Sequence, residues 1–300
     1  NVILVGITKQ GEWKYYPGDT GAMRDGSWEN DPGLERAFLT VDTRDAALYF
    51  PDAEQDPLSI DCVFPVLHGS NGEDGRLQGY FDMMHVPYSC CSVLAAAKTY
   101  DKFTCNQYLK AFGVRISESL LLRSGQSVSD EDVIEKIGLP CFIKPSLGGS
   151  SFGVTKVKTK EDIQPAISKA FEEAQEVLVE AFMDGTELTC GCYKTKEKSV
   201  VFPLTEVVTH NEFFDYDAKY KGEVDEITPA RISEELTKRV QTLTSAIYDI
   251  LGCSGIIRVD YIVTAGEKIN LLEVNTTPGM TATSFIPQQA AAAGLSMTDI

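Results

Sequence analysis

The chain has 300 residues, of which 43% are hydrophobic, and it carries a formal net charge of −17 with a pI near 4.6. This length and composition allow two or three domains, each with its own core. The acidic balance argues against nucleic acid or an anionic membrane as a partner, because both are bound mainly through clustered lysines and arginines. No run approaches the roughly 18 apolar residues of a membrane span. The eight cysteines show no CxxC pair, which favours reduced thiols and a cytoplasmic protein.

The first part of the chain reads as an α/β unit. Residues 1–7, NVILVGI, and residues 60–67, IDCVFPVL, are apolar enough to be buried strands of a parallel sheet. The glycine-rich stretch at 68–79, HGSNGEDGRLQG, predicts a loop that bends sharply before a helix. Open α/β sheets bind ligands at loops of this kind, so His68 and Glu73 mark a candidate site. A structural role for a lone histidine is an equally good interpretation.

Residues 141–154, CFIKPSLGGSSFGV, read as a strand, a loop of glycine and serine, and a returning strand. Backbone N–H groups and serine hydroxyls in such a loop can bind phosphate oxygens, and Lys144 supplies positive charge. The loop is not a Walker A motif, because Val154 follows Gly153 where that motif has lysine and a strand follows where it has a helix. A hairpin tip that binds nothing is the competing interpretation.

Helices and connecting segments surround this loop. A helix over residues 100–112 is predicted to carry Lys102 and to end at Gly113. The strand over 176–187 passes through an Asp-Gly pair and reads as a hinge between domains, while the aromatic and charged segment 213–223 has the composition of a lid. Ser233 then caps a helix that is expected to continue to Leu251 and to stop at Gly252.

Residues 255–280, GIIRVDYIVTAGEKINLLEVNTTPGM, predict two strands joined by a tight turn. A period of two places Asp260 on one face of the first strand, and it places Leu271, Glu273 and Asn275 together on one face of the second. Three oxygen-bearing side chains can then converge from neighbouring strands, which is the ligand type that Mg²⁺ takes. The alternative is a solvated face of an antiparallel hairpin.

The ordered motifs HGxNGEDGxLQG, FIKPSLGGSSFGV, VLVEAF, FFDYDAKY, GIIRVDY and LLEVNTTPGMT, together with Lys102, resemble the D-alanine–D-alanine ligase family of the ATP-grasp fold over essentially the whole chain. The resemblance implies an α/β (α+β) fold, with an N-terminal substrate-binding parallel-sheet domain that lacks its first strand and two α+β domains that sandwich ATP. The implied boundaries are 1–93 for the N-terminal domain, 94–183 for the central domain with its phosphate loop at 147–153, and 184–300 for the C-terminal domain with a lid at 211–223 and the hairpin at 255–280.

The resemblance also implies the ligands, namely ATP and two Mg²⁺ ions, with Mn²⁺ as a substitute. It assigns the metals to three side chains, with the second of them bridging: Asp260, Glu273 and Asn275. It assigns the nucleotide to two lysines, the phosphate loop, the backbone at the end of the 176–183 strand, a ribose-binding glutamate and a lid lysine: Lys102, Lys144, Gly149, Ser150, Ser151, Glu180, Ala181, Met183, Glu187 and Lys219.

The implied reaction is ATP-dependent ligation of two D-alanines to D-alanyl-D-alanine through D-alanyl phosphate, as in the synthesis of peptidoglycan precursors. Arg258 and the Gly279 N–H would stabilise the oxyanion that forms when the second amine attacks. Ser284 and Lys219 would bind the carboxylate of the second substrate. His68 would lie near the first substrate.

The lid enters through Tyr220, which by resemblance would hydrogen-bond to Ser150 and exclude water from the acyl phosphate. The sequence departs from the family in three ways. The GGxSxExxVS segment that opens the family is not in the sequence, so material upstream of Asn1 is expected to be missing. Phe214 replaces a tyrosine common in the lid, and Ala181 replaces a lysine common beside adenine.

Three alternatives stay open at this point. The enzyme could join D-alanine to D-serine, or it could be another ATP-grasp ligase of a carboxylate and an amine. A chain without the upstream segment could also be a fragment that binds ATP without turning it over. The family resemblance further implies a homodimer that acts on small molecules in the cytoplasm.

Overall fold

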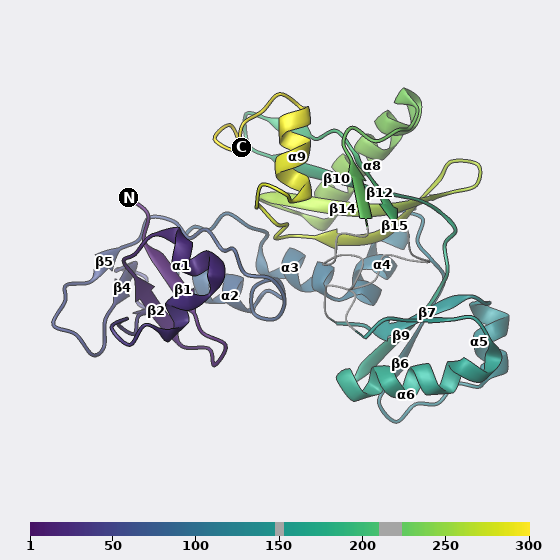
Figure 1. Ribbon diagram of the computed structural model, residues 1–300, viewed down its shortest axis with the longest axis horizontal. Helices are drawn as coiled ribbons and strands as arrows, with labels where there is room; N and C mark the ends of the chain where they lie inside the picture. Colours follow the sequence, from purple (N-terminus) through teal and green to yellow (C-terminus); the bar gives the residue numbers. More distant parts are fainter. Residues whose placement is uncertain (148–152, 210–223) are drawn as a thin grey trace. The chain divides into compact units, whose positions relative to one another are not determined.

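The computed structural model describes residues 1–147, 153–209 and 224–300. The chain forms two compact units, one made of Asn1–Phe64 with Gly79–Tyr88 and the other of Pro65–Gln78 with Ser89–Ile300. Figure 1 shows the helices and strands in sequence colours. Among the described helices, none combines the length and apolar character that crossing a membrane requires. The division into three domains at 93 and 183 stays a prediction.

Antiparallel strands build the first unit, where the sequence predicts a parallel sheet. The first two strands pair antiparallel through a tight turn in which the Thr8 N–H donates to the Glu12 carbonyl at 2.8 Å. Parallel pairing was not available to them, because it needs a crossover of roughly a dozen residues or more. A second antiparallel sheet has the order β3-β4-β5. The strands and helices of this unit are β1 (Leu4–Ile7), β2 (Trp13–Tyr16), α1 (Thr20–Asp25), η1 (Ser27–Asn30), β3 (Phe38–Leu39), β4 (Ala47–Tyr49), β5 (Leu58–Ser59) and the larger part of α2 (Arg76–Met84).

The prediction of a strand over residues 60–67 is wrong. After β5 the chain is irregular apart from one parallel bridge between Val63 and Tyr88. Pro65 has no N–H to donate to a ladder, and the flanking Phe64 and Val66 are 63% and 65% exposed. An apolar run therefore did not make a buried strand here, because no neighbouring strand among the described residues covers it.

The second unit contains a four-stranded antiparallel sheet of order β6-β9-β7-β8. Alternate residues of its central strands, such as Ile143 and Val179, are fully buried in one apolar cluster. Helix α6 adds Ile163 and Ile167 to that cluster, so it covers one face of the sheet as its apolar face predicts (Figure 1). The elements are β6 (Ser119–Arg123), α5 (Asp130–Lys136), β7 (Cys141–Pro145), β8 (Thr155–Val157), η2 (Lys160–Asp162), α6 (Ile163–Glu173) and β9 (Glu176–Ala181).

A larger sheet in the same unit has the order β13-β12-β10-β14-β15, and β11 pairs with β10 beside β12. Helix α8 covers one face and has the predicted ends, because the Ser233 hydroxyl accepts from the Leu236 N–H at 3.1 Å and Gly252 has φ +67°. Helix α9 packs on β10. The elements are β10 (Gly185–Lys194), β11 (Ser199–Val201), β12 (Thr205–Thr209), β13 (Val224–Ile227), α8 (Glu234–Leu251), β14 (Ile256–Thr264), β15 (Lys268–Asn275) and α9 (Phe285–Ala292).

Two helices precede these sheets, where the sequence predicts one over residues 100–112. Helix α3 (Val93–Tyr100) ends at Asp101, and α4 (Lys102–Lys110) begins immediately afterwards. Asp101 lies in an extended conformation, and its carboxylate accepts from the Thr104 N–H at 2.7 Å. This N-cap starts a new helix, so Lys102 becomes a first-turn residue of α4 rather than an interior one.

Candidate functional site

The β14–β15 hairpin carries its polar side chains on the face of the sheet opposite α8. The residues of β14 that alternate with them, Ile257, Val259 and Tyr261, are fully buried in the core that α8 closes. Asp260 lies directly opposite Glu273 on β15, and Arg258 lies opposite Asn275. Residues directly opposite each other in an antiparallel pair share a face of the sheet. The hairpin therefore brings together the expected metal ligands and the expected catalytic arginine.

The side chains of β15 do not alternate between the two faces of the sheet as predicted. The register shifts after Asp260, so that Tyr261 pairs with Leu271 and Leu272 has no cross-strand partner. This bulge turns Leu271 into the α8 core, together with Val274, whereas the sequence places Leu271 on the face of Glu273. The extra residue of a bulge reverses the side of every residue beyond it. Glu273 nevertheless keeps its predicted position beside Asp260.

Each carboxylate of this pair is balanced by a cation. The Arg258 guanidinium donates to both oxygens of Asp260, at 2.9 and 2.8 Å, and lies 3.9 Å from Glu273. Lys102 Nζ lies 3.1 Å from Glu273 Oε2. The Lys102 charge, followed by that of Arg258, outweighs burial and lowers the pKa of Glu273 to about 2. Glu273 is therefore held in the ionised form that a metal requires.

The pKa values of Lys102 and Arg258 are both shifted by Glu273 and other nearby carboxylates. Burial by itself lowers the pKa of Lys102, but Glu273, Glu180 and Glu73 together outweigh burial, and the pKa is raised. Burial likewise opposes the charge of Arg258, and Asp260, Glu273 and Glu187 raise its pKa well above the ordinary value. Both side chains thus stay charged, which suits ligands that carry phosphate or carboxylate groups.

Lys102 reaches the hairpin because α4 packs against β15. The segment after α4 adds a parallel bridge between Ile116 and Leu271, and the Leu271 N–H donates to the Arg115 carbonyl at 2.8 Å. A backbone contact therefore fixes the helix and strand at the point where the bulge ends. No local sequence signal pairs Lys102 with Glu273, because the contact depends on this packing.

A second buried ion pair lies on the smaller sheet. Lys144 on β7 and Glu180 on β9 are 2.6 Å apart, with side chains that are 11% and 4% exposed. The charge of Lys144 contributes to the lowered pKa of Glu273, and the charge of Glu180 to the raised pKa of Lys102. The two pairs are thus within electrostatic reach of each other, and both lysines act on the charge of Glu273.

Ser146 lies immediately after the end of β7, two residues beyond Lys144, and is fully buried. Its hydroxyl has no hydrogen-bond partner among the described residues. A buried hydroxyl without a partner is costly unless a ligand satisfies it, so Ser146 fits a site for a polar group such as a phosphate. The sequence motif contains Ser146, but its role was not predicted.

In the strand expected to hold adenine, both backbone groups of Ala181 already form hydrogen bonds within the protein. The Ala181 N–H donates to the Glu118 carbonyl at 2.9 Å, and the Ala181 carbonyl accepts from the Ser117 hydroxyl at 2.7 Å. Both groups therefore bond toward β6. Met183 is half-buried in the connection to β10, and Glu187 is half-buried on β10. Met183 thus lies between β9 and β10, and the interpretation of this segment as a hinge between domains stays a prediction.

The turn after β15 leads to α9 and brings two further predicted residues, Gly279 and Ser284, into contact. The Thr277 N–H donates to Asn275 Oδ1 at 3.0 Å. A Cβ added to Gly279 would lie 2.7 Å from the Ser284 hydroxyl, so these two residues are in contact. Ser284 immediately precedes α9, and the ring of Phe285 lies 5.2 Å from Arg258 Cζ. Sequence reasoning missed Phe285, which has no motif of its own.

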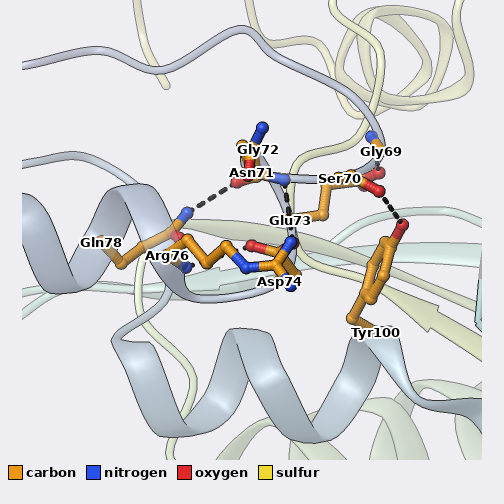
Figure 2. Close-up of polar contacts among 9 residues, drawn as sticks. All are labelled: Gly69, Ser70, Asn71, Gly72, Glu73, Asp74, Arg76, Gln78 and Tyr100. Atoms are coloured by element: carbon orange, nitrogen blue, oxygen red, sulfur yellow. Dashed lines mark hydrogen bonds and ion pairs between the residues drawn. The ribbon is translucent and has the colours of Figure 1, made fainter.

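The glycine-rich loop is folded on its own polar side chains (Figure 2). Glu73 accepts from the Gly69 N–H at 2.5 Å, and Ser70 shares a hydrogen bond with Tyr100 at 3.1 Å. Glu73 also accepts from the Thr277 hydroxyl at 3.0 Å, which connects this loop to the turn after β15. His68 is exposed at the start of the loop. The structure thus gives Glu73 a positional role that the sequence did not specify.

Some predicted residues cannot be placed. The phosphate-loop residues Gly149, Ser150 and Ser151 and the lid residues Lys219 and Tyr220 lie outside the described residues. The predicted contact between Tyr220 and Ser150 therefore stays a prediction, as does the lid at 211–223.

The predicted metal ligands suit a hard cation, although there are only three of them. No group of three or more His, Cys, Asp or Glu side chains within residues 1–147, 153–209 and 224–300 could hold a metal. The predicted set has two carboxylates and the amide oxygen of Asn275. Oxygen donors of this kind are those that Mg²⁺ takes with one or two protein carboxylates, water and phosphate oxygens completing its shell. These three ligands therefore fit a metal ion that arrives bound to a nucleotide better than they fit a metal ion held by the protein alone.

Comparisons with known proteins agree over most of the chain. The family model described as D-ala D-ala ligase N-terminus matches residues 1–91, and the one described as D-ala D-ala ligase C-terminus matches residues 108–300. A D-alanine–D-alanine ligase of Bacteroides fragilis (strain YCH46) is 85% identical over 241 residues, which are 80% of this chain and 74% of that protein. One of Parabacteroides distasonis is 57% identical over 278 residues, which are 88% of this chain and 84% of that protein.

Solved structures are also similar. The VanG D-Ala:D-Ser ligase of Enterococcus faecalis superposes with a TM-score of 0.91 at 34% identity and covers 100% of this chain and 87% of its own. The D-alanyl-alanine synthetase A of Vibrio cholerae superposes with a TM-score of 0.83 at 26% identity, covering 99% of this chain and 84% of its own.

Proposed function

The chain belongs to the D-alanine–D-alanine ligase family, and on that premise we propose that it joins two D-alanines to D-alanyl-D-alanine with ATP as the energy source. The observation that carries the proposal is the Asp260–Glu273 pair, whose two carboxylates share a face and are each balanced by a cation. The product is a precursor of peptidoglycan. We infer that the enzyme is a homodimer and that it acts in the cytoplasm.

The first step is phosphoryl transfer. A carboxylate oxygen of the first D-alanine bonds to the γ-phosphorus of ATP, the bond from that phosphorus to ADP breaks, and D-alanyl phosphate forms. Lys102 and Lys144 hold the phosphates, and the unpartnered Ser146 hydroxyl is available to them. Asp260, Glu273 and Asn275 would hold two divalent ions, which neutralise phosphate charge during the transfer. Because Ala181 bonds toward β6, the adenine contacts are left to Glu180 and Met183.

The second step forms the peptide bond. The amine of the second D-alanine, having lost a proton, attacks the acyl carbon, and phosphate leaves with the electrons of the bond that breaks. Arg258 and the Gly279 N–H stabilise the oxyanion. Ser284 and the first turn of α9 hold the second carboxylate, since a helix N-terminus attracts anions. Lys219 and Tyr220 act from the lid, and His68 lies near the first substrate.

The proposed reaction is tested by phosphate release from the full-length protein. Release is expected to require ATP, Mg²⁺ and D-alanine together, and mass spectrometry is expected to identify D-alanyl-D-alanine. ATP binding by calorimetry without release would instead favour a protein that only binds nucleotide. Turnover of other carboxylic acids in preference to D-alanine would also contradict the proposal.

A D-alanine–D-serine ligase is the second candidate, because the VanG D-Ala:D-Ser ligase has a TM-score of 0.91 over the whole chain. The relatives at higher identity carry the D-alanine–D-alanine name, which favours D-alanine at the second site. Equal concentrations of D-alanine and D-serine in one reaction separate the two candidates. A product that is mainly D-alanyl-D-serine would favour the second.

A further inference from the structure

Gln289 is a fully buried amide on α9 whose donors and acceptor are all used by the neighbouring sheet. Its Oε1 accepts from the Gly191 N–H at 2.8 Å. Its Nε2 donates to the Thr189 carbonyl at 3.0 Å and to the Thr205 hydroxyl at 3.1 Å. Two of the three partners are backbone groups of β10. The side chain therefore bonds to β10 much as a strand would.

The sheet needs such a partner at this point. The neighbour of β10 changes from β12, which pairs at Thr189, to β11, which pairs from Cys192 onward. Gly191 lies in the gap, where the Phe202 N–H donates to its carbonyl at 2.9 Å and Gln289 accepts from its N–H. Without the amide, the buried Gly191 N–H would have no partner from the described residues, which carries a large energetic penalty.

Glycine at 191 allows α9 to lie directly on the strand. A Cβ there would be 2.4 Å from Ile286 Cδ1 and 3.0 Å from Gln289 Oε1. Gly191 is also the cross-strand partner of Arg258, so this contact lies on the face of the sheet that carries the site. Helix α9 is thus held by close packing on Gly191, by two hydrogen bonds to β10 and by one to Thr205 of β12.

The start of α9 carries the groups assigned to the second substrate. Ser284 precedes the helix and contacts Gly279, and Phe285 lies over Arg258. The Ser284 side chain does not cap its own helix, and its hydroxyl shares a hydrogen bond with Thr281 at 2.8 Å. Any shift of α9 along or away from β10 would move these groups relative to Arg258.

We propose that Gln289 is a positioning residue: it fixes α9 on β10 so that Ser284 and the first turn of the helix meet the carboxylate of the second amino acid. The inference rests on the proposed function for the identity of that ligand. The positioning itself concerns only residues of this chain. Gln289 touches no predicted ligand, so it acts through α9 alone.

The test compares Gln289→Met with Gln241→Met in the full-length protein. Gln241 on α8 also donates to a backbone carbonyl, that of Phe202 at 3.0 Å, but from the other face of the sheet. Methionine keeps the approximate volume of glutamine and removes the hydrogen bonds. If Gln289→Met does not fold, Gln289→Asn replaces it, because its amide is shorter by one methylene.

Two measured quantities are expected to change in Gln289→Met and not in Gln241→Met. The KM for D-alanine at the second site should rise about tenfold or more, while the KM for ATP stays near its wild-type value, because misplacement by about an ångström has effects of this size. Hydrogen exchange at residues 284–292 should accelerate in the ligand-free protein, while exchange in α8 does not.

Unchanged exchange at 284–292 would overturn the positioning role. Accelerated exchange with equal rises in both KM values would also overturn it, because a general loss of structure would explain that result. If the wild-type protein releases no phosphate with D-alanine, the proposed function fails, and the exchange measurement still decides whether Gln289 holds α9.

Discussion

Asp260 and Glu273 are cross-strand partners in the β14–β15 hairpin, and the cations that balance them come from different elements, Arg258 from β14 itself and Lys102 from α4. Like charges directly opposite each other in a sheet are destabilising, so the pair requires either these cations or bound metal. The same four side chains can thus serve the folded protein without ligands and the reaction with them.

Replacing Lys102 with methionine should make the Tm depend more strongly on divalent metal than it does in wild type. Glu273 then lacks its nearest cation, and repulsion from Asp260 should lower the Tm by about 2–4 °C in the absence of Mg²⁺. Added Mg²⁺ should restore more of the Tm in this variant than in wild type. Lys98→Met is the control, since Lys98 bonds to the Leu251 carbonyl at 3.3 Å instead. Equal responses to Mg²⁺ in both variants would contradict the metal assignment.

Gly255 and Gly252 should differ in their tolerance of alanine, although both have φ +67°. A Cβ at Gly252 meets nothing within 4 Å, whereas one at Gly255 would lie 2.1 Å from the Ser89 carbonyl oxygen. Gly252→Ala should reduce the free energy of unfolding by about 1 kcal/mol, from backbone conformation alone. Gly255→Ala should cost about 3 kcal/mol or more, because backbone must also move. Urea unfolding measures both, and similar losses would show that the contact with Ser89 is not rigid.

Glu206 should stabilise the protein at neutral pH and not in acid. Arg231 donates to both of its oxygens at 2.9 Å, and this hydrogen bonding lowers the pKa of Glu206 below its ordinary value of 4.5. The contribution is present above pH 4.5 and is lost as pH falls through the lower folded-state pKa. Glu206→Gln should therefore be about 1 kcal/mol less stable at neutral pH and should approach wild type in acid. A Tm difference that does not shrink on acidification would contradict this.

Local patterns predicted the elements whose ends and faces are decided by nearby residues. Ser233 and Gly252 are the observed caps of α8, and the alternation of apolar residues in β14 matches the core. The face of Asp260 could be predicted for the same reason. These features depend on backbone geometry within a few residues, which is why a single sequence was sufficient.

Features that depend on distant partners could not be predicted in this way. The bulge at Leu272 follows from how β15 pairs with β14, and the contact of Lys102 with Glu273 follows from packing of α4 on β15. The antiparallel first unit likewise depends on which strands meet. Gln289 lies in an alanine-rich helix without any motif, and only its three bonds to β10 and β12 distinguish it.

The most direct test of the hairpin as the metal site is phosphate release by Glu273→Gln in the full-length protein. Glutamine keeps the size of the side chain but removes the charge that the proposed metals require. Release that depends on D-alanine should fall by at least about 10³-fold, with circular dichroism like that of wild type. A folded variant that retains release within about tenfold of wild type would contradict the role of Glu273 and of the hairpin as the metal site.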